Sequence, residues 1–101
     1  FRSGKSVPNL PSESVLELTV NITKTGRITP VKNEPLDYMP WGIISQQTAV
    51  NELVTRAAVH KDKKAFVQAL HIDPMVHNFA TIPELSEKLW QVNKPFFKPK
   101  K

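Results

Sequence analysis

The chain has 101 residues, 40% of them hydrophobic, and its 14 Lys and Arg against 9 Asp and Glu give a formal charge of +5. It contains no cysteine, which excludes a disulfide framework and a metal site built from thiolates. No apolar run approaches the roughly 20 residues that a membrane-spanning helix needs, so we expect no membrane partner and a cytoplasmic location.

The N-terminal part is expected to begin with a loop and continue as a β-strand. Residues 1–13 contain Gly4, Pro8 and Pro11 among polar side chains, which predicts an extended loop. Residues 15–22 alternate strictly between apolar and polar positions, which is typical of a half-buried strand. The apolar face of this strand comprises Leu16, Leu18, Val20 and Ile22.

A reversal follows the strand. Gly26 supplies the positive φ that a tight turn requires, and residues 27–31 return as a second extended piece. Pro30 has no N–H to donate, so it must lie at an edge or at a strand end. The segment therefore predicts a β-hairpin.

The pattern changes from strand to helix after a connecting loop over residues 33–40. Residues 41–60 carry apolar side chains at spacings of three and four, which predicts an amphipathic helix with Pro40 in its first turn. Glu52 and Arg56 can pair on its solvent side. The apolar stripe expected to face inward comprises Ile43, Ile44, Val50, Leu53, Val54, Ala57 and Ala58.

The last third of the chain is predicted to be a helical cluster. Asp62 can cap a helix on which Lys63 points to water, and Asp73 before Pro74 repeats the capping signal for a short turn. Residues 81–84, Thr-Ile-Pro-Glu, read as a capping box at the start of a final helix. The inward residues of the first of these helices are Ala65, Phe66, Ala69 and Leu70.

Together these elements predict an α+β fold, with an N-terminal β-hairpin or strand pair followed by a C-terminal helical cluster. We expect a single domain over residues 1–101. Within it, residues 1–40 form the loop and hairpin portion, residues 41–97 the helical portion and residues 98–101 a basic tail.

The positive charge is concentrated at the C-terminal end. Lys94 and the lysines of residues 98–101 supply four of the 14 basic residues, and the rest of the chain is nearly neutral. Such a tail is typical of a solvated chain end, so we expect no nucleic-acid partner. Phe96 and Phe97 are expected to anchor this end against the body or a partner.

No constellation of residues for catalysis stands out. The only candidates for a metal site are His71, Asp73 and His77, and capping and helix-end roles account for the first two. No elbow motif surrounds a serine, and the three glycines are isolated, which leaves no phosphate-cradling loop. We therefore assign no catalytic, cofactor-binding or metal-binding residue in this chain.

Three large side chains precede or open the predicted long helix. Tyr38, Met39 and Trp41 are candidates for a substrate pocket or an interface, because clefts for small molecules are lined by such side chains. Core and interface anchors at a junction between a loop and a helix use the same residue types.

The order of these pieces resembles the C-terminal segment of glycoside hydrolase family four, and the resemblance covers nearly the whole chain. The residues that carry it are Gly4, the Asn-Leu-Pro of residues 9–11, residues 15–18, Gly26, Pro30, Val31, Gln47, residues 51–54, Ala57, Ala58 and residues 66–76 with their Gln-Ala-Leu and Asp-Pro.

The resemblance implies a parent enzyme related in fold to lactate and malate dehydrogenases, of whose C-terminal domain this chain is part. Family members, such as α-glucosidases and α-galacturonidases, use NAD and manganese to oxidise the sugar transiently at C3, remove the C2 proton and eliminate the aglycone. The family's cofactor loop and the Cys and His of its metal site precede the segment resembled. The chain alone is therefore expected to be inactive, with the remainder of the parent or further copies as its partners.

A second interpretation is an independent small α+β module that binds a protein or an anion through its helical face and tail. The first residue, Phe1, is not a methionine, which favours a piece of a longer protein. Arg2 stands where the family commonly has Asn, so the chain departs from the family pattern at this position.

Overall fold

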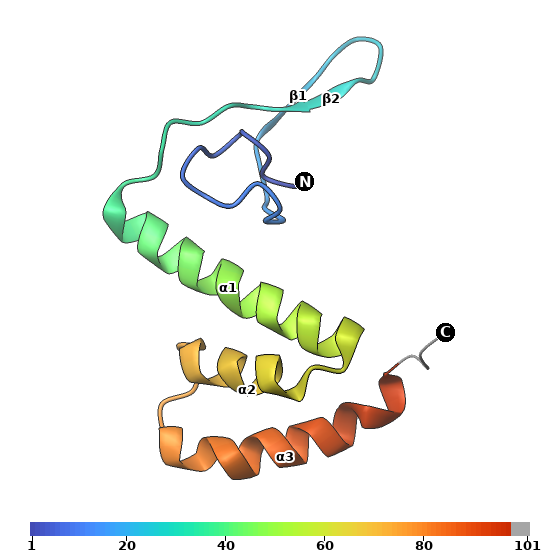
Figure 1. The fold of residues 1–101 in the computed structure, drawn as a ribbon. Coiled ribbons are helices and arrows are strands. Elements are labelled where there is room, and N and C mark those ends of the chain that lie inside the picture. The colour runs from blue at the N-terminus through green and yellow to red at the C-terminus, as the bar shows by residue number, and fades with distance from the viewer. Residues whose placement is uncertain (98–101) are drawn as a thin grey trace. The chain divides into compact units, whose positions relative to one another are not determined.

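The computed structural model describes residues 1–97, in which a two-stranded antiparallel sheet is followed by helices (Figure 1). This order confirms the predicted α+β class. The predicted basic tail, residues 98–101, lies outside the described residues. The elements are β1 (Val20–Ile22), β2 (Ile28–Pro30), α1 (Tyr38–His60), α2 (Lys63–Ile72), the 3-10 helix η1 (Phe79–Thr81), α3 (Ile82–Asn93) and the 3-10 helix η2 (Lys94–Phe96).

The chain divides into two compact units, Phe1–Thr48 and Ala49–Lys101, and the division falls within α1. The partition into a hairpin portion over residues 1–40 and a helical portion over residues 41–97 follows element type and stays a prediction. Within residues 1–97, no helix has both the length and the apolar character needed to cross a membrane.

The β-hairpin of the first unit forms where it was predicted. β1 and β2 pair antiparallel with Val20 opposite Pro30, and Gly26 has a φ of +79° in the turn between them. Pro30 ends β2, as the missing N–H requires.

The first strand is shorter than the predicted residues 15–22, because β2 offers only three residues to pair with. Leu16, Leu18 and Val20 are nevertheless half-buried, whereas Glu17 and Thr19 between them are exposed. The prediction was wrong for Ile22, which is 68% exposed. The alternation of apolar and polar residues therefore corresponds to a half-buried extended segment. Only its C-terminal end, β1, pairs with β2.

Residues 1–13 are not the extended loop that their composition predicted. Their backbone turns back on itself, with bonds such as Ser6 N–H to the Ser3 carbonyl (2.8 Å) and Leu10 N–H to the Val7 carbonyl (3.2 Å). Val7 and Leu10 are 5% and 6% exposed, so this loop supplies core side chains of the first unit. Composition marked the turns correctly but missed that two apolar side chains between them are buried.

Two serine hydroxyls in the first unit are buried without a hydrogen-bond partner among the described residues, those of Ser3 and Ser14. An unpaired buried hydroxyl costs about 1–3 kcal/mol of desolvation. We therefore expect Ser3→Ala to raise the free energy of unfolding by about 1 kcal/mol in urea denaturation. Ser86→Ala is the matched control and should lower it, because the buried Ser86 Oγ donates to the Pro83 carbonyl at 2.9 Å. Destabilisation by Ser3→Ala would show that its hydroxyl has a partner.

In the second unit, α2 and α3 run in opposite directions and pack against each other (Figure 1). Ala65, Ala69 and Leu70 of α2 are buried as predicted, together with Ile82 of α3. Trp90 of α3 contacts two aromatic rings, with its ring centroid 5.9 Å from that of Phe66 and 4.8 Å from that of Phe97.

The predicted C-terminal anchor is therefore half right. Phe97 packs on Trp90, whereas the side chain of Phe96 is exposed.

The predicted side-chain cap forms at the N-terminus of α2 but not at the N-terminus of α3. The Asp62 carboxylate accepts the Ala65 N–H at 3.0 Å, as a cap should. The capping box at Thr81 and Glu84 does not form, because Thr81 has helical backbone angles and its hydroxyl donates to the Asn78 carbonyl. Asn78 instead caps the preceding turn through Ala80 N–H.

The long helix α1 begins three residues earlier than the predicted Trp41, with Pro40 in its first turn. Proline is tolerated there because the first N–H groups of a helix have no partner within the helix. Glu52 and Arg56 form the predicted ion pair at 3.8 Å. The predicted inward stripe was partly wrong, since Ile43, Val54 and Ala58 are exposed.

Candidate functional site

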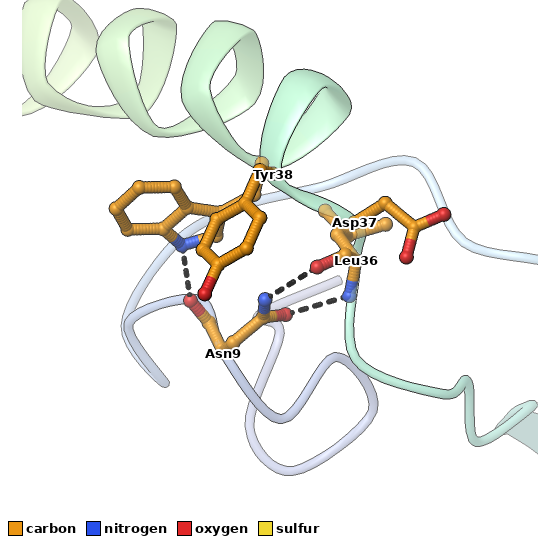
Figure 2. A pocket seen from close by; sticks show the side chains of 5 residues that line it. Asn9, Leu36, Asp37 and Tyr38 are labelled. Atoms are coloured by element: carbon orange, nitrogen blue, oxygen red, sulfur yellow. Dashed lines mark hydrogen bonds between the residues drawn. The ribbon is translucent and has the colours of Figure 1, made fainter.

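The first unit contains a small open cavity of about 220 Å³ at the start of α1 (Figure 2). Two segments far apart in the sequence meet there, the N-terminal loop and the junction between the connecting loop and the helix. Five residues line the cavity: Asn9, Leu36, Asp37, Tyr38 and Trp41.

Asn9 fixes the geometry of this cavity. Its side-chain amide donates to the Leu36 carbonyl (2.8 Å) and accepts the Leu36 N–H (2.9 Å), as Figure 2 shows. A primary amide carries the same donor and acceptor pair as a peptide group, so it pairs with the backbone as a neighbouring strand would. The Asn9 carbonyl also accepts the indole N–H of Trp41 at 2.8 Å. One residue thus holds both the loop before α1 and the first turn of α1.

The local sequence explains why these groups converge. Leu10 is buried immediately after Asn9, which ties this position to the core of the unit. Asp37 directly precedes α1, and its carbonyl accepts the first helical N–H, from Trp41 (2.9 Å).

Of the three residues predicted for a pocket or interface, Tyr38 and Trp41 line the cavity and Met39 does not. The Tyr38 side chain is 93% exposed and that of Trp41 is 40% exposed. Sequence reasoning did not assign Asn9 and Leu36 to this site. The Asn-Leu-Pro of residues 9–11 was the available signal, and it entered only as part of the family resemblance.

The lining of the cavity combines aromatic side chains with a single carboxyl group. Two aromatic side chains offer apolar surface, and Asp37 is the one acidic residue among the five that line the cavity. Both polar ends of the Asn9 amide are already used by Leu36, so they hold the wall in place.

Two of the three candidate metal ligands, Asp73 and His71, have local structural roles. The Asp73 carboxylate accepts the Met75 N–H at 2.9 Å, and Nδ1 of His71 lies 2.9 Å from the Val67 carbonyl one turn earlier. Within residues 1–97, no three His, Asp or Glu side chains are grouped closely enough to hold a metal ion. Gly4 and Gly26 lie in isolated turns.

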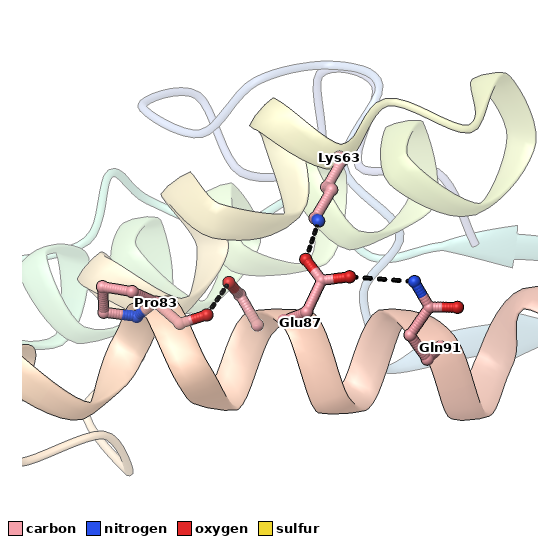
Figure 3. Close-up of polar contacts among 5 residues, drawn as sticks. Lys63, Pro83, Glu87 and Gln91 are labelled. Atoms are coloured by element: carbon pink, nitrogen blue, oxygen red, sulfur yellow. Dashed lines mark hydrogen bonds and ion pairs between the residues drawn. The ribbon is translucent and has the colours of Figure 1, made fainter.

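A group of three polar side chains in the second unit joins α2 to α3 (Figure 3). Glu87 accepts a hydrogen bond from Gln91, one turn further along α3 (2.8 Å), and pairs with Lys63 at the start of α2. Lys63 was predicted to point to water, and it turns to Glu87 instead.

The Gln91 hydrogen bond and then the Lys63 ammonium lower the pKa of Glu87 below its ordinary value. A carboxyl with a depressed pKa contributes stability above the ordinary glutamate pKa of about 4.3 and loses it as pH falls through the lowered value. The contribution should be small, because exposed pairs are screened. We expect an NMR titration of the Glu87 carboxyl to give a midpoint below this ordinary value. Gln91→Ala should raise that midpoint, and an unchanged midpoint would contradict the assignment.

A family model described as the family 4 glycosyl hydrolase C-terminal domain matches residues 2–76. These residues include the cavity and the turn at Asp73 and Pro74. No curated protein and no solved structure matches the chain.

Proposed function

This chain belongs to glycosyl hydrolase family 4, of which it carries the C-terminal domain, and from this premise we propose that it is the substrate-domain and oligomerisation part of a glycosidase. The proposed reaction cleaves a glycosidic bond by transient oxidation of the sugar and elimination, with NAD and manganese supplied by the rest of the enzyme. The family match over residues 2–76 is the observation that carries the proposal.

In this proposal the metal and cofactor sites lie in the rest of the enzyme, because this chain lacks the residues for them. It has no cysteine for the metal site that the family resemblance implies, and its three glycines do not form a phosphate-binding motif. The chain's share is then to present binding surface and to contact the remainder of the enzyme or further copies of itself. A cytoplasmic location and an α-glucoside or α-galacturonide as substrate belong to the same proposal.

The activity test compares this chain alone with the same chain joined to the preceding part of its enzyme. With NAD and manganese present, we expect the isolated chain to release no nitrophenol from a panel of nitrophenyl glycosides and the joined enzyme to do so. Omission of either NAD or manganese should abolish the joined activity. Turnover by the isolated chain, or a joined enzyme that turns over no glycoside, would contradict the proposal.

Within this function, we propose that the cavity at Tyr38 and Trp41 contacts the carbohydrate or an adjoining subunit. Its support is the combination of apolar aromatic surface with the Asp37 carboxylate in a preformed hollow. Tyr38 offers the cleanest probe, because an almost fully exposed side chain contributes little to stability.

In the joined enzyme, Tyr38→Ala should raise KM for the glycoside several-fold and leave the midpoint of urea unfolding unchanged. Met39→Ala is the matched control, since Met39 is also exposed (78%) and does not line the cavity. If the cavity contacts a subunit instead, Tyr38→Ala should shift the oligomer mass in light scattering and leave KM unchanged. If neither Tyr38→Ala nor Met39→Ala changes KM or the oligomer mass, the cavity has no part in the proposed function.

A further inference from the structure

The extended segment of residues 14–22 has one edge that faces away from β2. This edge is paired near residues 14–16 and unpaired further along, towards Ile22. In the hairpin, Val31 N–H donates to the Thr19 carbonyl and Thr23 N–H donates to the Arg27 carbonyl, so the odd positions of the strand bond towards β2. In an antiparallel ladder the intervening positions turn their backbone groups to the opposite edge. Leu18, Val20 and Ile22 therefore present their N–H and C=O groups away from β2.

The same opposite edge is already occupied further back along the strand. Leu16 N–H donates to the Phe1 carbonyl (2.8 Å), and the Phe1 amino group donates to the Leu16 carbonyl (3.2 Å). Arg2 and Val15 form an antiparallel bridge, and Ser3 N–H donates to the Ser14 carbonyl at 2.6 Å. The first residues of the chain thus run antiparallel to residues 14–16 and are joined to them by an isolated bridge and its flanking hydrogen bonds.

The direction of this ladder predicts its continuation. A backbone that enters Phe1 in extended form would run along the strand towards the hairpin tip. Its second residue before Phe1 would lie opposite Leu18, and its fourth residue before Phe1 would lie opposite Val20. Among residues 1–97, no backbone group bonds to Leu18 or Val20 on this edge.

We infer that the edge formed by Leu18, Val20 and Ile22 is the docking surface for an extended segment joined to the amino group of Phe1. The occupant is the part of the enzyme that enters this C-terminal domain, so the inference rests on the proposed function. The continuous hydrogen-bond ladder from Ser3 to Phe1 selects this occupant over a separate partner, because the register is already set and the ends are adjacent.

The side chains of residues 16–20 also predict the order of apolar and polar residues in the segment before Phe1. Residues directly opposite each other in a sheet project to the same face. Leu16, Leu18 and Val20 are half-buried on one face, while Glu17 and Thr19 are exposed on the other. The second and fourth residues before Phe1 should therefore be apolar, and their neighbours polar.

The experiment adds short extensions in front of Phe1 in the full chain. The extension Val-Thr-Val-Thr places its valines opposite Leu18 and Val20. Thr-Val-Thr-Val has the same composition but places them on the other face, and Gly-Ser-Gly-Ser is the weak strand former. Amide hydrogen exchange at Leu18 and Val20, measured by NMR, reports whether the edge has become paired.

With Val-Thr-Val-Thr we expect exchange at Leu18 and Val20 to slow by about tenfold or more relative to Gly-Ser-Gly-Ser. The Asn21 amide should not change, because this position bonds towards β2. The urea midpoint should be highest for Val-Thr-Val-Thr, with Thr-Val-Thr-Val below it.

Equal exchange with all three extensions would overturn the inference. Protection of Leu18 and Val20 in the unextended chain that disappears on dilution would also overturn it, since the edge would then pair with a second copy. Neither readout involves a sugar, NAD or manganese. A failure here therefore differs from a failure of the proposed activity.

Discussion

Replacement of Ile82 by Ala is expected to lower the free energy of unfolding by about 3 kcal/mol, within the range of about 2–5 kcal/mol for such truncations. Ile82 is the first residue of α3 and is 1% exposed, which makes it one of the two most completely buried side chains among the described residues. The loss combines the transfer free energy of the removed methylene and methyl groups with the cavity that remains.

Guanidinium unfolding followed by far-ultraviolet circular dichroism would measure this loss. Ile82→Val should cost about 0.5–1.5 kcal/mol, because it removes one methylene. Val92→Ala on the same helix should cost less than about 0.5 kcal/mol, since Val92 is mostly exposed. An Ile82→Ala protein as stable as the Val92→Ala protein would contradict the buried position of Ile82.

The second large effect is expected at Asn9, where Asn9→Ala should cost about 2 kcal/mol. The substitution removes both hydrogen bonds to the Leu36 backbone, each worth about 1 kcal/mol. The bond from the Trp41 indole survives in principle, because it is made to the Asn9 main-chain carbonyl. The cavity should therefore lose its shape while α1 itself persists.

A second variant, Asn9→Asp, tests the two hydrogen bonds to Leu36 separately. The carboxylate still accepts the Leu36 N–H but cannot donate to the Leu36 carbonyl, so one contact is kept and one becomes repulsive. Thermal unfolding with amide chemical shifts at Leu36 and Trp41 would follow both effects. Asn33→Ala is the control, because the Asn33 side chain bonds only locally, to the Val31 carbonyl (3.1 Å). If Asn9→Ala behaves like Asn33→Ala, the pairing with Leu36 does not hold the site.

Local sequence signals predicted the features that depend on a few neighbouring residues. Gly26 marked the hairpin turn, Asp62 marked the start of α2, and the spacing of Glu52 and Arg56 predicted their pair. Each of these depends on backbone geometry within four residues, which composition and spacing encode directly.

The missed features depend on residues that are distant in the sequence. Asn9 and Leu36 are 27 positions apart, and no periodicity relates them. Thr81 carried a capping signal, but the preceding 3-10 turn had already placed its backbone in a helical conformation. Tyr38 and Trp41 could be chosen as site candidates by their size and position. The part of the cavity lining formed by Asn9 and Leu36 could not be predicted without the fold.

The two tryptophans of the chain are divided between its two compact units, with Trp41 in the first and Trp90 in the second. The Trp41 indole donates a hydrogen bond, whereas the Trp90 ring makes tilted contacts with the rings of Phe66 and Phe97, so their emission spectra should differ. Single Trp→Phe variants would give each unit its own intrinsic fluorophore. Denaturation curves from the two variants would then coincide if the units unfold together and separate if they do not.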